Sequence, residues 1–326
     1  MGLLVDGVWQ DRPLLESRDG RFVRPTTRFR NWVTPDGSAG PSGDGGFAAE
    51  PGRYHLYVAL SCPWAHRTVI FRKLKQLEDV ISMSVVSPMM LEQGWTFNES
   101  EGSSGDAVNG KRTLAEVYVL ADPRFSGRVT VPALWDKQRR SIVNNESAEI
   151  IRMFNSAFNA FTAAKTDYYP EPLRAEIDRI NALVYETVNN GVYRSGFATA
   201  QDAYEEAFLA LFDTLDRLEQ RLSGQRYLVG NVLTEADWRL FTTLIRFDAV
   251  YYSHFKCNLR RITDYPNLSN YLRDLYQAPG VAETVSIDNI KRHYYGSMRQ
   301  INPSGIVPLG PQLDFTSAHD RARFGR

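Results

Sequence analysis

The feature that most constrains the fold of this 326-residue chain is a change of pattern near Pro172. Before this point, short runs rich in β-formers flank a segment in which apolar residues have helical spacing. After it, apolar residues recur every three or four positions in long stripes, which is typical of amphipathic helices. The sequence therefore predicts an α/β half followed by an all-α half.

In the first half, strands are predicted at 54–60, 81–86 and 128–135, and a helix at 64–77. Pro132 interrupts the third run, so that strand is expected to begin after it, with the Val131–Pro132 bond in a special conformation such as cis. Asn144 or Asn145 is expected to cap a helix that ends at Phe154. The segment 92–126 is expected to form a loop beside the site.

In the second half, one stripe over 173–184 is expected to be closed by Gly191, and another over 204–222 by Gly224. A capping box at 234–237 precedes a helix over 238–250, and a further helix is predicted at 266–277. We expect three parts: an irregular N-terminal extension over 1–50, an α/β domain over 51–160, and a helical domain over 161–326 with a C-terminal tail.

Charge and hydropathy limit the kinds of partner. Lys plus Arg equals Asp plus Glu at 38 each, so no net charge draws the chain to nucleic acid or anionic lipid. No apolar run approaches the roughly 20 residues of a membrane span, and the N-terminus lacks an apolar signal core. The five histidines show no metal-binding spacing. A cytoplasmic protein with small-molecule partners and no metal is expected.

Cys62 is the main candidate nucleophile, because it lies where a predicted strand passes into a predicted helix. The free N–H groups and dipole of a helix N-terminus favour a thiolate and are expected to lower its pKa below the ordinary value of about 8.5. Ala65 stands where a resolving cysteine would be, so an outside thiol must regenerate Cys62, and glutathione is the obvious one in a reducing cytosol. Cys257 lacks these features and is predicted to be structural.

A second group of residues suits an extended peptide. The turn at Val131 offers backbone groups, while the helix that begins near Glu146 and Ser147 offers N–H groups and a hydroxyl to a carboxylate. Together they fit the γ-glutamyl end of glutathione, although ordinary helix capping explains Glu146 and Ser147 equally well. Tyr193 and Tyr294 are expected just outside helices, where a phenol can reach a cleft, with packing as the alternative role.

These residues lie in longer sequence motifs. Through these motifs the chain resembles one family nearly from end to end, the glutathionyl-hydroquinone reductases, or xi class of the glutathione transferase superfamily. The most specific motifs are Cys-Pro-Trp-Ala at 62–65, Asn-Asn-Glu-Ser at 144–147 and Asn-Gly-Val-Tyr at 190–193. The resemblance implies a thioredoxin-like domain followed by an all-α domain, the glutathione transferase architecture. It also implies a homodimer built through the helical halves.

The resemblance further implies the reaction, in which a glutathionyl-hydroquinone loses its sulfur substituent and glutathione disulfide forms. Cys62 is then the nucleophile, and Tyr193 and Tyr294 hold the hydroquinone hydroxyl. The matching motifs imply a glutathione site that consists of Trp95, Arg128, Val131, Glu146 and Ser147.

Other functions remain open from the residues alone. A general monothiol reductase of the omega-like kind, acting on mixed disulfides or dehydroascorbate, would also use Cys62 but would not need the two tyrosines. A non-catalytic ligand carrier would have an unreactive Cys62. A conjugating transferase is disfavoured, because a reactive cysteine captures glutathione covalently whereas conjugation needs glutathione's own thiolate.

Overall fold

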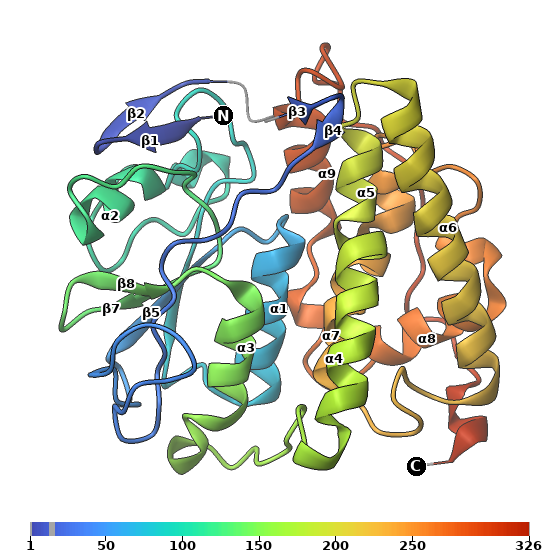
Figure 1. The fold of residues 1–326 in the computed structure, drawn as a ribbon, viewed down its shortest axis with the longest axis horizontal. Helices are drawn as coiled ribbons and strands as arrows, with labels where there is room; N and C mark the ends of the chain where they lie inside the picture. The colour runs from blue at the N-terminus through green and yellow to red at the C-terminus, as the bar shows by residue number, and fades with distance from the viewer. Residues whose placement is uncertain (1, 13–16, 326) are drawn as a thin grey trace. The chain divides into compact units, whose positions relative to one another are not determined.

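The computed structural model describes residues 2–12 and 17–325, which form two compact units (Figure 1). The first unit contains Thr26–Thr166, the strands β1 and β2 that precede it, and Asp288–Ser297 from near the C-terminus. The second contains Asp167–Ile287, the short strands β3 and β4 with the segment up to Pro25, and the chain from Met298 onward. The chain passes from the first unit to the second between Thr166 and Asp167, close to the change of pattern near Pro172. Two short segments are exceptions: the one up to Pro25 belongs to the second unit, and Asp288–Ser297 belongs to the first.

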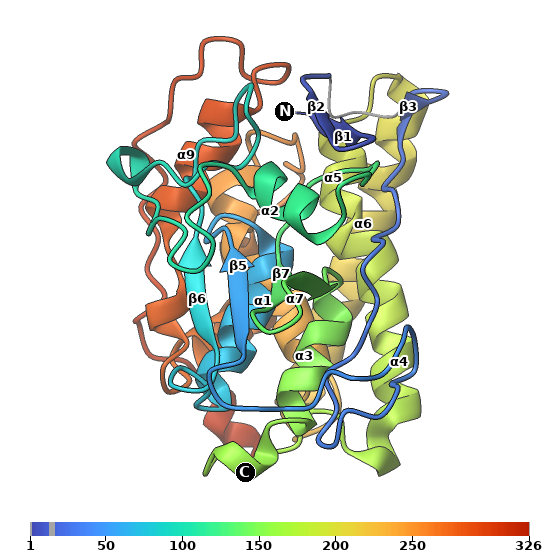
Figure 2. The same cartoon turned by 90° about the vertical axis from the view of Figure 1, so that its left-hand side faces the viewer.

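The first unit is built on a four-stranded mixed sheet. Its strands are β5 (Tyr54–Val58), β6 (Ser82–Val85), β7 (Ala133–Asp136) and β8 (Ser141–Asn144), in the order β6-β5-β7-β8. The neighbours β5 and β6 are parallel (Figure 2), and the pairs β5–β7 and β7–β8 are antiparallel. Every residue of β5 is buried, as expected for a continuous apolar run in a central strand.

The start of β7 after Pro132 is confirmed, and the Val131–Pro132 bond is cis. The strand β8 was not predicted.

This unit also contains the helices α1 (Pro63–Leu74), α2 (Leu114–Ala121) and α3 (Ser147–Ser156), with α1 packed against both α3 and β5, and most of α9 (Ile287–Ser297). The segment 92–126, which was expected to hold a loop, also contains α2, which was not predicted. Thr113 and Glu116 form a capping box at the start of α2, a signal that the sequence did contain.

The residue that caps α3 is also corrected. It is Glu146, whose carboxylate accepts from the Ala148 N–H, rather than Asn144 or Asn145. Asn144 instead accepts from the Glu146 N–H at 2.7 Å and so shapes the turn before the helix.

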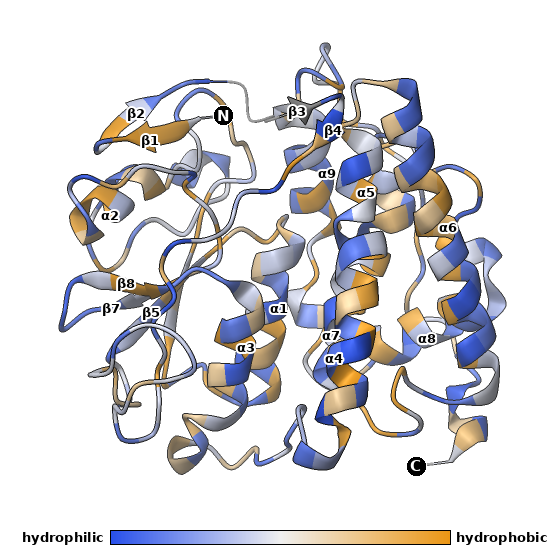
Figure 3. Cartoon of the chain, viewed as in Figure 1, coloured by the Kyte–Doolittle hydropathy of each residue, from blue (hydrophilic) through white to orange (hydrophobic). Residues whose placement is uncertain are grey.

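The second unit is helical. It contains α4 (Arg174–Val184), α5 (Gly191–Gly196), α6 (Gln201–Gly224), α7 (Glu235–Arg246) and α8 (Pro266–Tyr276), and α5 packs on α6. Figure 3 shows mixed hydrophobic and hydrophilic residues along α4 and α6, which is typical of amphipathic helices. The predicted helices that match α6, α7 and α8 are confirmed.

Gly191 does not close a helix as expected. Instead, a π-helical segment over Tyr185–Asn189 carries the chain from α4 to α5, which Gly191 begins. Tyr193 therefore lies inside α5. Tyr294 likewise lies inside α9 (Ile287–Ser297), which was not predicted, so the expectation that both tyrosines sit outside helices was wrong.

The N-terminal extension contains regular structure that was not expected. β1 (Leu3–Val5) pairs with β2 (Val8–Gln10), and β3 (Ser17–Arg18) pairs with β4 (Arg21–Phe22). Asp-Gly turns connect both pairs, with positive φ at each residue: 47° and 76° in the first turn, 51° and 74° in the second. Two such residues are the requirement of a two-residue hairpin turn. In the described part of the chain, no helix is long and apolar enough to cross a membrane.

The capping box before α7 predicts a large effect on stability. Asp237 is fully buried and accepts from the N–H groups of Leu228 and Thr234 and from the Tyr271 hydroxyl, each at 2.8 Å. Asp237→Ala would leave these donors buried without an acceptor, so we expect the free energy of unfolding to fall by about 3 kcal/mol or more in urea denaturation. Asp264→Ala, which removes a surface ion pair with Arg261, is the matched control, with an expected loss within about 1 kcal/mol. Similar losses in both variants would contradict the prediction.

Candidate active site

Cys62 lies at the N-cap of α1, half-buried, with extended backbone geometry. Pro63 occupies the first helical turn, where its missing N–H costs nothing. The Cys62 thiol donates to the Val131 carbonyl at an Sγ–O distance of 3.6 Å. The structure thus brings the candidate nucleophile against the cis-proline turn, at a helix end that favours negative charge.

A hydrogen-bond network holds the turn that faces Cys62. The buried Tyr118 hydroxyl donates to the Thr130 carbonyl at 2.7 Å and accepts from the Thr130 N–H at 3.2 Å. Asn145 donates to the same hydroxyl at 3.1 Å. One phenol therefore fixes both backbone groups of the residue before Val131. Tyr118 and Asn145 were not singled out from the sequence, because their role depends on contacts between distant segments.

Glu146 and Ser147 lie together at the start of α3. The Glu146 carboxylate accepts from the Ala148 N–H at 3.2 Å, so it does cap the helix. The Ser147 hydroxyl accepts from the buried Arg67 guanidinium, on α1, at 3.4 Å. Arg67 thus connects the helix of the cysteine to the start of α3, a link that no local sequence signal showed.

Trp95 and Tyr294 are connected through α9. The buried Trp95 ring stacks on His293, with ring centroids 4.9 Å apart and an interplanar angle of 21°. His293 Nδ1 donates to the Pro88 carbonyl at 3.0 Å, which identifies Nδ1 as the protonated nitrogen. Tyr294 follows directly and is fully buried. A helix from near the C-terminus therefore belongs to the unit that holds Cys62.

Of the other predicted site residues, Arg128 is half-buried in the segment that leads to Val131. Tyr193 alone belongs to the second unit, where its ring packs against Tyr251 and Phe255 at centroid distances of 6.1 and 5.5 Å. Cys257 is fully buried, and burial raises the pKa of its thiol, which suits a structural role. No group of side chains in the described residues could hold a metal ion.

Comparisons with known proteins identify the fold and the family. Family models match at 61–157 (glutathione S-transferase, N-terminal domain) and at 201–274 (glutathione S-transferase, C-terminal domain). The predicted fold class is thereby confirmed, with a thioredoxin-like half followed by a helical half.

Relatives are similar along the whole chain. The glutathionyl-hydroquinone reductase YqjG of Escherichia coli (strain K12) is 58% identical over 100% of both chains. The glutathionyl-hydroquinone reductase PcpF of Sphingobium chlorophenolicum is 56% identical over 95% of this chain and 96% of that one.

Solved structures give the same result. The glutathione-bound structure of YqjG has a TM-score of 0.92 at 56% identity and covers 98% of this chain and 99% of its own. A xi class glutathione transferase from Natrialba magadii has a TM-score of 0.91 at 48% identity, with 99% and 97% covered. The chain therefore belongs to the glutathionyl-hydroquinone reductases, the xi class of the glutathione transferase superfamily.

Proposed function

We propose that this protein reduces glutathionyl-hydroquinones to hydroquinones through a Cys62–glutathione mixed disulfide, with release of glutathione disulfide. The observation that carries the proposal is the position of Cys62 at the N-cap of α1, with its Sγ 3.6 Å from the Val131 carbonyl. The half-buried thiol is accessible, and Ala65 leaves no neighbouring thiol to compete with glutathione. Family membership supports the choice of substrate.

In the first step, the Cys62 thiolate attacks the sulfur of the glutathionyl substituent. Because an aryl carbanion is a poor leaving group, the ring first tautomerises to a ketone form, and the carbon that bears sulfur gains its proton in this step. The carbon–sulfur bond then breaks, a sulfur–sulfur bond forms, and the electron pair of the broken bond flows to the ketone oxygen, which is protonated to give the hydroquinone. In the second step, the thiolate of a second glutathione attacks the mixed disulfide and releases Cys62 and glutathione disulfide.

The phenols of Tyr193 and Tyr294 are proposed to hold the hydroquinone oxygen and to help protonate the ring carbon. The rival function, general reduction of mixed disulfides, expels a thiolate and needs neither phenol. Assaying the purified protein with glutathionyl-menadiol and, separately, with a glutathione mixed disulfide tests the proposal. Turnover of the disulfide alone would favour the rival.

Glutathione is proposed to bind along Trp95, Arg128, Val131, Glu146 and Ser147. The Val131 backbone would pair with the cysteinyl part of the peptide, and the start of α3 would receive the γ-glutamyl carboxylate. Arg128 supplies a positive charge for the tripeptide's carboxylates, and the Glu146 carboxylate accepts from its ammonium. The stacking of Trp95 on His293 gives this proposed pocket a rigid aromatic wall.

We expect the charges of this pocket to matter for glutathione affinity. Arg128→Ala should raise the KM for glutathione about ten- to a hundredfold, because it removes a charge-assisted hydrogen bond, with little change in kcat. Glu146→Gln should also raise it, and this variant keeps an oxygen that can still cap α3. Arg124→Ala, at an exposed position four residues before Arg128, is the matched control for steady-state kinetics. An unchanged KM in both test variants would show that the pocket is assigned wrongly.

We further propose that residues 51–160 bind glutathione, that 161–326 form the substrate and dimerisation region, and that the protein is a cytoplasmic homodimer. The balance of 38 basic and 38 acidic residues supports small-molecule partners rather than nucleic acid or a membrane surface.

A further inference from the structure

We propose that Arg24, in the N-terminal segment, is a positioning residue for Tyr193, whose phenol ring it fixes and whose hydroxyl it makes a stronger proton donor. The inference rests on the proposed function, since it deepens the role assigned there to Tyr193. It gives the N-terminal segment a part in the reaction, although that segment contributes none of the proposed catalytic or glutathione-binding residues.

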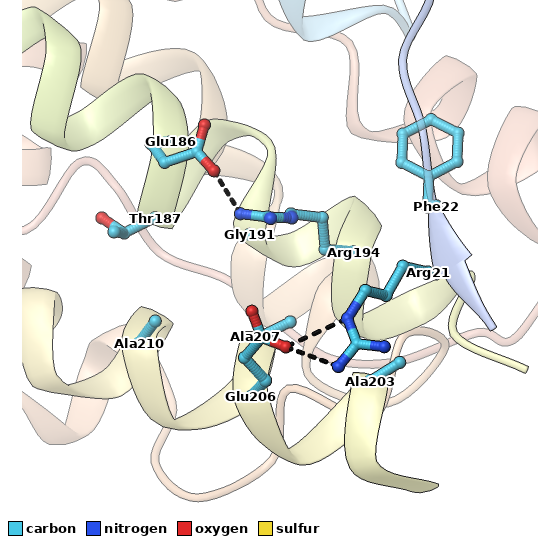
Figure 4. Close-up of a pocket in the computed structure, with 10 residues that line it drawn as sticks. All are labelled: Arg21, Phe22, Glu186, Thr187, Gly191, Arg194, Ala203, Glu206, Ala207 and Ala210. Carbon is cyan, nitrogen blue, oxygen red and sulfur yellow. Dashed lines mark hydrogen bonds and ion pairs between the residues drawn. The ribbon is translucent and has the colours of Figure 1, made fainter. Parts of the chain in front are cut away.

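The N-terminal segment is held firmly against α5 and α6. The Thr199 N–H donates to the Gly20 carbonyl at 3.0 Å, and a Cβ at Gly20 would lie 2.4 Å from the Cβ of Ala200. Arg21 donates twice to the Glu206 carboxylate, at 3.1 and 2.9 Å (Figure 4). Phe22 follows on the same strand and is buried. The Gly20 hydrogen bond, its close approach to Ala200 and the buried Phe22 ring therefore fix the backbone that leads to Arg24, while the exposed Arg21 ion pairs add little.

Arg24 contacts both Tyr193 and the helix that carries it. Its guanidinium carbon lies 4.9 Å from the centroid of the Tyr193 ring, within the range of a cation–π interaction. Its Nε–H donates to the Asn190 side-chain oxygen at 2.8 Å, and Asn190 directly precedes α5. Tyr193 and Asn190 both belong to α5 or directly precede it, so they keep the same positions relative to each other. The hydrogen bond to Asn190 therefore holds the Arg24 guanidinium over the Tyr193 ring.

The surroundings of the Tyr193 ring are otherwise aromatic. Four rings pack against it at centroid distances between 5.5 and 6.5 Å, those of Phe22, Phe197, Tyr251 and Phe255. Phe255 fits because Gly196 has no side chain: a Cβ there would lie 2.2 Å from the Phe255 ring.

The charged and titratable groups described near the Tyr193 ring include Arg24, Tyr251 and His254, whose ring stacks on Phe255. Burial lowers the pKa of His254 to about 4, so its ring is neutral near pH 7. On α5 itself, the charged residue Arg194 is paired with Glu186. An apolar environment strengthens the effect of a nearby charge, so the Arg24 guanidinium acts on the Tyr193 phenol with little screening.

The chemical consequence has a definite sign. A cation beside the phenol stabilises the phenolate relative to the phenol and so lowers the pKa of Tyr193. A stronger acid transfers its proton more readily to the ring carbon that bears sulfur, in the tautomerisation that precedes departure of the hydroquinone. Reduction of a mixed disulfide, which expels a thiolate, gains nothing from this contact.

The test compares Arg24→Met, which keeps a long side chain but removes its charge, with Arg24→Lys, which keeps the charge. The control is Arg21→Met, because Arg21 forms exposed ion pairs that are expected to contribute little. With ¹³Cζ-labelled tyrosine, the NMR resonance of Tyr193 is assigned by its loss in Tyr193→Phe. We expect Arg24→Met to raise the pKa of Tyr193 by about half a unit to one and a half units, from the usual size of a cation–π interaction. Arg24→Lys should shift it less, and Arg21→Met should leave it unchanged.

Kinetics supply the second readout. Arg24→Met should lower kcat for glutathionyl-menadiol about three- to thirtyfold, while reduction of a mixed disulfide and the KM for glutathione stay as in wild type. In a Tyr193→Phe background, Arg24→Met should cost nothing more. An unmoved Tyr193 titration, an equal shift in Arg21→Met, or a further loss in the Tyr193→Phe background would each overturn the inference. If Tyr193→Phe leaves turnover intact, the proposed role of Tyr193 fails instead, and the titration still decides whether Arg24 acts on its phenol.

Discussion

Replacing Cys62 with Ser is expected to lower the turnover of glutathionyl-hydroquinones by at least about a thousandfold, because a hydroxyl is a far weaker nucleophile than a thiolate near neutral pH. The loss should extend equally to mixed-disulfide substrates, since both reactions begin with attack by this sulfur. Steady-state assays with the two substrates measure it.

Cys257→Ala is the matched control, because Cys257 is fully buried and burial raises the pKa of its thiol. Its turnover should match wild type. Labelling of the native protein with iodoacetamide should modify Cys62 first, with a rate that titrates below a pKa of about 8.5. Wild-type turnover in Cys62→Ser would contradict the whole proposed mechanism.

The second large effect is expected to be selective. The substitutions Tyr193→Phe and Tyr294→Phe keep the ring and its packing, and they remove the hydroxyl that would hold the hydroquinone oxygen. By comparison with the loss of one positioned donor, kcat for glutathionyl-menadiol should fall about ten- to a thousandfold in each single variant. Reduction of a mixed disulfide should stay within about a few-fold of wild type, because a thiolate leaves without help.

Tyr185→Phe, at an exposed tyrosine on the segment between α4 and α5, should change neither reaction. Measuring Cys62 reactivity in every variant separates a chemical effect from a disturbed fold. Equal losses on both substrates would argue against a role for the phenols in hydroquinone chemistry. No loss on either would leave general mixed-disulfide reduction as the better function.

The sequence alone was sufficient where the signal is local. The strand before Cys62, the helix start at Pro63, the strand after Pro132 and the capping box at Thr234–Asp237 each depend on a few adjacent residues, and all are present. Helices with long stripes, such as α6, were also predicted well, because many periodic positions contribute to one pattern. The elements β8 and α9 were missed, although they are as long as β6 and α8, which were predicted.

By itself, then, the sequence determined the two halves of the fold and the family, because these follow from local patterns and from motifs that match along the whole chain, and it singled out Cys62 as the proposed nucleophile. Only the tertiary structure decided that α9 brings Tyr294 into the unit of Cys62, that Tyr118 fixes the backbone before Val131, and that Arg24 lies over Tyr193. The physical reason is sequence distance: these contacts join residues from 12 positions apart, Tyr118 and Thr130, to 205 positions apart, Pro88 and His293 of α9. The periodicity of one segment carries no information about which distant segment it meets.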